Sequence, residues 1–322
     1  MVNHGNMYGP DFTFLGIERC DLDIPSSYAD ADVVIVGAPI DSGTSHRSGA
    51  KFGPQAIRGG DYLPHDAERP HLALRIDALK EMKVVDAGDL LMPGSDLVAS
   101  LEVLAQATEK ISRAGAIPVI LGGDHSIASA DVAGIARHRG MGKISMIHFD
   151  AHADTADILY GNLASHGTPM RRLIESGAIP GKNFVQVGLR GYWPPKEIFD
   201  WMREQGMRWH TMDEIWQRGF QAVMKDAISE ALSTADSLYI SIDVDSLDPS
   251  FAPGTGTPEP GGIMSADLLR MVRTLCLEHN VVGIDIVEVS PAYDVSDLTV
   301  NVAHRLAFEC MAGLAARRRN QQ

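Results

Sequence analysis

Short apolar runs of strand length recur along the chain, and most are separated by stretches of helical periodicity. The runs are rich in Val and Ile and continuous rather than alternating, which is typical of strands covered on both faces in a parallel sheet. They lie at residues 33–37, 84–85, 117–121, 144–149, 184–187, 238–242 and 281–287. One intervening stretch, Leu97–Ala114, carries its apolar residues near one helical face. This order predicts an α/β fold, a doubly wound, mostly parallel β-sheet with helices on both faces.

The alternation runs on without an internal repeat, a low-complexity tract or a clear linker. We therefore predict one catalytic domain over residues 1–322, with residues 1–30 as an N-terminal extension. The first 16 residues lack a basic stretch followed by an apolar region, and no run is long enough to span a bilayer. The three cysteines, Cys20, Cys276 and Cys310, lie far apart, which fits a reducing compartment. A cytoplasmic protein is expected.

The chain is acidic, with 28 Lys and Arg against 42 Asp and Glu and a net charge of -14. This balance argues against non-specific binding to nucleic acid or to an anionic membrane. It suits a small cationic substrate, and it is also what solubility alone would produce. The net charge therefore argues against two classes of binding partner, nucleic acid and anionic membranes, but does not identify a substrate.

Candidate metal ligands follow three of the predicted strands, in the segments 122–125, 150–154 and 243–245. The six side chains are His125, Asp150, His152, Asp154, Asp243 and Asp245. Taken singly, such residues are more often loop histidines or helix-capping aspartates. However, the carboxyl ends of parallel strands meet at one edge of a sheet. Carboxylates and imidazoles gathered there suit two divalent cations, and such a pair indicates metal-assisted hydrolysis.

Three further expectations concern the neighbourhood of these ligands. Asp150, His152 and Asp154 would point to one side if the chain stays extended beyond its strand. His166 lies in a probable loop, where a single histidine is usually a surface residue. Glu288 follows the run 281–287, at the carboxyl end of the predicted strand, where a carboxylate often caps a helix or forms a salt bridge.

The segments resemble the ureohydrolase (arginase/agmatinase) family, whose members split guanidino compounds into urea and an amine. The matches are Gly-Gly-Asp-His ending at His125, Asp-Ala-His-Ala-Asp from Asp150, Ser-Ile-Asp-Val-Asp-Ser-Leu-Asp-Pro from Ser241, Ser-His-Arg-Ser-Gly-Ala-Lys-Phe-Gly-Pro from Ser45, His-Gly-Thr-Pro from His166, and Val-Glu-Val-Ser-Pro from Val287. They occur in the family's order from about residue 33 onward. The resemblance implies an arginase-like α/β/α fold, and a trimer or hexamer.

The resemblance also implies a ligand set. It assigns His125, Asp150, Asp154 and Asp243 to one metal, and His152, Asp150, Asp243 and Asp245 to the other. Manganese is the family's usual metal, and some relatives use nickel. Asp154 is then the candidate to pass on the nucleophile's proton, and His166 the candidate proton shuttle to solvent. Glu288 is the candidate to bind the guanidinium through paired N–H bonds.

The substrate is the least constrained expectation. Residues 156–165 do not look like the arginase loop that grips an amino-acid tail, whereas the segments from His166 and Gly254 look closer to agmatinases and guanidino-acid hydrolases. Hydrolysis of agmatine to putrescine and urea, a step of polyamine metabolism, is our first hypothesis. A guanidino acid such as 4-guanidinobutyrate, or guanidine itself, is the alternative. A single-metal amide deacetylase and a non-catalytic metal-binding protein are the competing classes.

Overall fold

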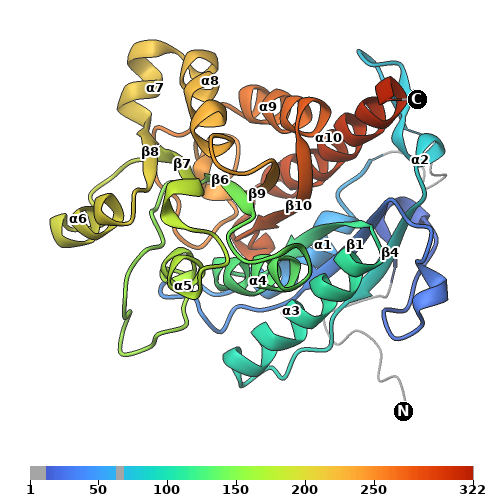
Figure 1. Cartoon of the computed structure of the whole chain (residues 1–322), viewed down its shortest axis with the longest axis horizontal. Helices are drawn as coiled ribbons and strands as arrows, with labels where there is room; N and C mark the ends of the chain where they lie inside the picture. The colour runs from blue at the N-terminus through green and yellow to red at the C-terminus, as the bar shows by residue number, and fades with distance from the viewer. Residues whose placement is uncertain (1–11, 63–68, 322) are drawn as a thin grey trace.

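The centre of the molecule is an eight-stranded sheet in which every neighbouring pair is parallel. The computed structural model describes residues 12–62 and 69–321. The sheet order is β4-β1-β5-β10-β9-β6-β7-β8 (Figure 1). Its strands are β1 (Val33–Ala38), β4 (Val84–Asp89), β5 (Ile117–Gly122), β6 (Ile144–Phe149), β7 (Phe184–Leu189), β8 (Arg208–Thr211), β9 (Ser237–Asp243) and β10 (Asn280–Val287).

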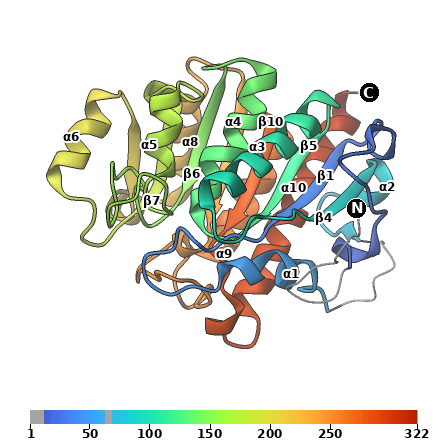
Figure 2. The same cartoon turned by 90° about the horizontal axis from the view of Figure 1, so that it is seen from below.

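Helices cover both faces of this sheet. They are α1 (Gly53–Arg58), α2 (Ala78–Glu81), α3 (Leu97–Arg113), α4 (Ala128–Arg139), α5 (Pro169–Ser176), α6 (Lys196–Glu204), α7 (Met212–Arg218), α8 (Phe220–Ala231), α9 (Ser265–Glu278) and α10 (Leu298–Gln321). Figure 1 shows α8, α9 and α10 above the sheet, and Figure 2 shows α3, α4 and α5 on the opposite side. The predicted fold class is confirmed.

Strand β1 illustrates why the runs are apolar throughout. Val33 and Ile35 join the core cluster that contains residues of α8, α9 and α10. Val34 and Val36 join a second cluster with residues of α3. Successive side chains of a strand point to opposite faces, so a sheet between two helical layers needs apolar residues at every position.

One strand departs from the sequence prediction, and part of a predicted segment lies outside the described residues. Strand β8 was missed because it is an edge strand of four residues, Arg-Trp-His-Thr, which carries no apolar run and pairs with β7. Residues 1–11 of the predicted N-terminal extension lie outside the described residues. Within its described part, Phe14 and Leu15 are fully buried and join the core. None of the helices in the described ranges combines the length and the hydropathy needed to span a bilayer.

The sheet order places four strand ends side by side at the middle of one edge. Strands β5, β10, β9 and β6 are consecutive. The three strands expected to deliver metal ligands are therefore not all neighbours, because β10 lies between β5 and β9. That strand ends just before Glu288, which brings this carboxylate to the same edge.

Candidate metal centre

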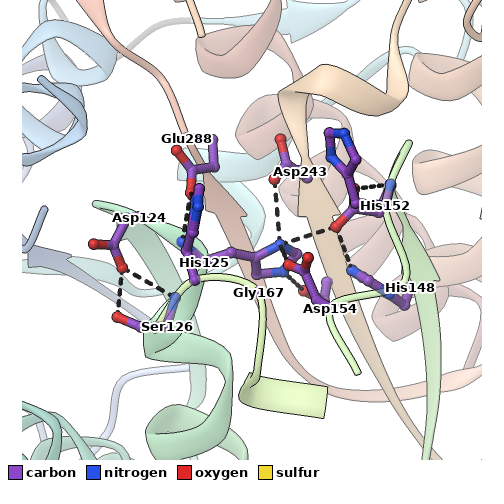
Figure 3. A network of polar contacts seen from close by, with 12 residues as sticks. Asp124, His125, Ser126, His148, His152, Asp154, Gly167, Asp243 and Glu288 are labelled. Atoms are coloured by element: carbon purple, nitrogen blue, oxygen red, sulfur yellow. Dashed lines mark hydrogen bonds and ion pairs between the residues drawn. The ribbon is translucent and has the colours of Figure 1, made fainter. Parts of the chain in front are cut away.

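His125 stands at the centre of three carboxylates. Its Nδ1 atom lies 3.1 Å from Asp150 Oδ2, 3.2 Å from Asp154 Oδ2 and 3.2 Å from Asp243 Oδ2 (Figure 3). The turn after β5 makes this possible, because a Cβ on Gly123 would come within 1.9 Å of the Ile40 carbonyl oxygen. Only glycine lets the backbone pass so close.

A second group shares Asp150. His152 Nδ1 lies 3.1 Å from Asp245 Oδ2 and 3.6 Å from Asp150 Oδ1. Asp150 thus directs one oxygen to each histidine. Asp243 contacts residues of both groups. Its Oδ2 faces His125, and its Oδ1 accepts the backbone N–H of Asp245 at 2.8 Å. All six predicted ligands are brought together at one edge of the sheet.

The route of the chain through these residues differs from the expected one. Strand β6 ends at Phe149, and Asp154 has a left-handed backbone with φ of 53°. The condition for Asp150, His152 and Asp154 to point to one side, a chain that stays extended beyond β6, is therefore not met. The backbone instead turns so that Asp154 points back toward His125.

One imidazole at the cluster was missed in the sequence. His148 lies inside β6, and its Nε2 atom is 2.9 Å from Asp150 Oδ2. The Gln186 side-chain amide contacts its other ring nitrogen at 3.0 Å. The period of two along a strand places His148 on the same face as Asp150, and this signal could have identified it. The apolar run around His148 predicts a strand at this position and gives no sign of the metal cluster.

These residues fit a pair of divalent cations. Asp150, Asp243 and Asp245 are almost fully buried, and so is the His125 ring. Two buried ligand atoms, His125 Nδ1 and Asp150 Oδ2, have no hydrogen-bond partner. Buried polar atoms left without partners are costly. The carboxylate oxygens and imidazole nitrogens of this cluster form the mixed donor set that manganese and nickel accept.

Without cations the cluster holds extra protons. Burial raises the pKa of Asp243 well above its ordinary value, and the charges of Asp245 and Asp150 raise it further. Burial lowers the pKa of His152, but the neighbouring carboxylates Asp245 and Asp150 outweigh burial and raise that pKa to about 12. A metal binds only deprotonated ligands, so protons and cations compete for this site.

We expect manganese binding to release protons and to weaken as the pH falls. The sign follows from the raised pKa values, because the metal-free site is partly protonated at neutral pH and the loaded site is not. Isothermal titration calorimetry at pH ~7 in two buffers of different ionisation enthalpy measures the release. A buffer-independent binding enthalpy, or tighter binding at lower pH, would contradict the expected competition.

A second pair of predicted residues lies beside the metal cluster. Glu288 Oε1 is 2.9 Å from His166 Nδ1 and accepts the backbone N–H of His125 at 2.9 Å. Its Oε2 is buried without a hydrogen-bond partner. Glu288 has a φ of 65°, so the backbone turns sharply where it leaves β10. The arrangement leaves one carboxylate oxygen for another ligand.

His166 is buried, and both of its ring nitrogens have partners. Burial lowers its pKa, but the charge of Glu288 outweighs burial and raises the pKa to about 9. The backbone N–H of Ser45 donates to Nε2 at 3.0 Å, and the Ser45 hydroxyl lies 2.6 Å from the same atom. A backbone donor requires a lone pair on Nε2, so this contact describes the neutral ring with its proton on Nδ1, facing Glu288, and protonation of Nε2 below pH about 9 would break it.

Asp124 of the Gly-Gly-Asp-His segment is not among the metal groups. Its Oδ2 accepts the backbone N–H of Gly43 at 2.7 Å, and its Oδ1 accepts that of Ser126 at 3.0 Å. The first bond holds the loop that carries Ser45. The second starts the short helix that begins at His125. Asp124 therefore ties the His166 contact to the turn that positions His125.

Comparison with known proteins identifies the family. The family model "Arginase family" matches residues 31–313. Guanidinopropionase of Pseudomonas aeruginosa is 39% identical over 286 residues, which cover 88% of this chain and 86% of that protein. The mitochondrial agmatinase of Gallus gallus is 36% identical over 295 residues, 91% and 84% of the two chains.

Solved structures agree with this result. The structure described as Trypanosoma cruzi formiminoglutamase with Mn2+2 has a TM-score of 0.83 and 27% identity, covering 96% of this chain and 100% of that one. The match extends over nearly the whole sheet and its helices, and the family model spans every segment that contributes to the site. The chain therefore belongs to the arginase family and is a hydrolase of the class that acts on guanidino and amidino compounds.

Proposed function

We propose that this protein uses two divalent cations, manganese or nickel, to hydrolyse agmatine to putrescine and urea. The observation that carries the proposal is the pairing of a shared-carboxylate cluster with a buried, free oxygen of Glu288. The first feature suits a metal pair and the second suits a guanidinium. The chain's acidity, with a net charge of -14, also favours a cationic substrate.

Six residues would hold the cations. His125, Asp150, Asp154 and Asp243 surround one position, while His152, Asp150, Asp243 and Asp245 surround the other. When bound, the two cations would lower the pKa of a water and so supply a nucleophile strong enough for a resonance-stabilised guanidinium. Four carboxylates balance two divalent charges, so Glu288 leaves the site negative.

The chain's own residues would orient the substrate and move protons. Glu288 Oε2 would accept an N–H bond from the guanidinium, next to Gly256, which places no side chain against that oxygen. A Cβ at that glycine would lie 3.6 Å from Oε2. Asp154, which faces His125, would take the proton of the attacking water and pass it to the departing amine. His166 would exchange protons with solvent through the exposed Ser45 rather than directly.

Two arginines of the loops around the site are already bonded to the protein, and this supports a substrate whose tail is not a carboxylate. Arg47 donates to the carbonyl oxygens of Gly256 and Thr255 and lies 4.5 Å from the centre of the Tyr293 ring. Arg190 donates to several backbone carbonyls, including that of Asp245 at 2.6 Å. Both guanidinium groups are thus occupied by the fold. A carboxylate tail would need a cation of this kind, whereas the ammonium of agmatine would not.

A guanidino acid is the second candidate. Guanidinopropionase is at least as similar to this chain as agmatinase is. Sequence identity to these relatives therefore does not decide between agmatine and a guanidino acid as the substrate. The cytoplasmic location and the trimer or hexamer expected from the family resemblance are further predictions.

A urea-release screen tests the proposal. Agmatine, arginine, guanidinopropionate, 4-guanidinobutyrate and guanidine are each supplied to metal-free protein reloaded with manganese or with nickel. We expect agmatine to give the highest kcat/KM. Preference for a guanidino acid would move the assignment to the second candidate. Full activity with one metal per chain would favour the single-metal class instead.

A further inference from the structure

A line of buried polar side chains continues from the metal cluster into the core. His125 Nε2 lies 2.9 Å from Ser241 Oγ, and Ser241 Oγ donates to Asp285 Oδ1 at 2.9 Å. All three side chains are fully buried. Ser241 on β9 and Asp285 on β10 are direct partners in the parallel register. The line is therefore built into the centre of the sheet.

The line extends two residues further from the metals. Tyr239 lies two positions before Ser241 on β9, on the same face of the strand. Its hydroxyl is buried without a hydrogen-bond partner, and after burial itself the nearby charges of Asp131 of α4 and of Asp285 raise its pKa well above the ordinary value. Tyr239 lies among apolar side chains such as Val282 and Ile135, and Ser241, Asp285 and Asp131 are fully buried. Burying hydroxyls and carboxyls there costs free energy that an apolar residue would not, so stability of the core alone does not account for them.

The direction of the hydrogen bonds provides an explanation. A histidine binds a cation through Nδ1 only when its proton is on Nε2. Ser241 can accept that Nε2–H because its own hydroxyl hydrogen is donated to Asp285. The partner of the non-ligating nitrogen thus fixes both the tautomer and the orientation of the ring. Nδ1 is then left facing the three carboxylates with a free lone pair.

We propose that Ser241 and Asp285 are positioning residues for His125 and set the affinity of the metal position that His125 occupies. The other position is supported differently, because Asp245 Oδ1 accepts the backbone N–H of Ala151 at 3.1 Å. Loss of the Ser241 hydroxyl therefore weakens one of the two positions. This inference rests on the proposed metal pair, and it is tested by metal binding without any substrate.

The test is a manganese titration of the metal-free protein with the Ser241→Ala variant. Wild type binds two ions per chain. The variant retains one binding step of wild-type affinity, while the other weakens about 10–100-fold. At a manganese concentration that fills both positions of wild type but one position of the variant, the variant's electron paramagnetic resonance spectrum is that of isolated ions, whereas wild type shows coupled pairs. Ser241→Thr, which keeps a hydroxyl in place to accept the Nε2–H of His125, retains both binding steps.

Ser145→Ala is the matched control. Ser145 is a buried serine of the neighbouring strand β6, and its hydroxyl donates to the carbonyl oxygen of Ala231. This variant loses a buried hydroxyl from the same sheet and keeps both metal steps. Asp285→Ala reproduces the Ser241→Ala defect, and the double variant is no worse than either single one, because both act through one line of contacts.

Three results would overturn the inference. They are two steps of wild-type affinity in Ser241→Ala, equal weakening of both steps, and additive defects in the double variant. Urea release is followed in parallel with wild type. If wild type binds two ions but releases no urea from any guanidino compound, the proposed reaction fails while the assignment of Ser241 and Asp285 stands.

Discussion

Asp150→Asn is expected to remove at least one cation per chain and to lower kcat at least ~10³-fold, about the loss of one major catalytic contribution. Asp150 is the residue that both metal groups share. Each of its oxygens faces a different histidine, at 3.1 and 3.6 Å. An amide removes the negative charge and turns one acceptor into a donor. Either His125 or His152, with the cation beside it, would then face an amide N–H group in place of a carboxylate oxygen.

Metal analysis and urea release on the same sample measure this effect. The control is Asp226→Asn, which changes an exposed aspartate of α8 that pairs with Arg218. Exposed ion pairs contribute little to stability, so the control should keep two ions and normal turnover. Two tightly bound ions and unaltered urea release in Asp150→Asn would show that the shared carboxylate is not a bridging ligand.

Glu288→Gln is expected to lower kcat/KM by ~10²–10³ while both cations remain bound. The expected size corresponds to losing one or two charge-assisted hydrogen bonds of about 1.5–3 kcal/mol each. Glutamine has nearly the same shape and can still accept the backbone N–H of His125, so the turn after β10 should persist. The guanidinium would lose its anionic partner, and His166 would lose the charge that faces Nδ1.

Steady-state kinetics separate binding from chemistry in this variant. A rise in KM alone would place Glu288 in substrate binding, and a fall in kcat alone would place it in transition-state stabilisation. Kinetics equal to wild type would remove Glu288 from both roles. Loss of metal from Glu288→Gln would instead indicate that its bond to His125 supports the cluster.

Much of the fold could be predicted because its determinants are local. Continuous Val and Ile runs mark strands buried on both faces, and this pattern found the seven longer strands of the sheet. The sequence also predicts that Asp150 and Asp243 lie close together, because the loops after parallel strands lie at the same edge of a sheet. Strand β8 escaped because Arg208–Thr211 is a short edge strand whose pattern is set by its pairing with β7.

Other features depend on contacts that no local pattern encodes. Ser45 meets His166 across 121 residues, and it does so because Asp124 fixes the loop before it. The insertion of β10 between β5 and β9 is a matter of sheet order, and it decides that Ser241 and Asp285 become partners. The left-handed backbone of Asp154 is a conformation that non-glycine residues rarely adopt. It is stabilised by its surroundings rather than by its own sequence.

The central claim is that the loops at this sheet edge bind two cations together. Anomalous diffraction from crystals grown with manganese, collected on both sides of the manganese absorption edge, tests it most directly. We predict two peaks roughly 3.5–4 Å apart, with Asp150 and Asp243 between them, His125 at one and His152 at the other. A single peak, or peaks away from these side chains, would contradict the account.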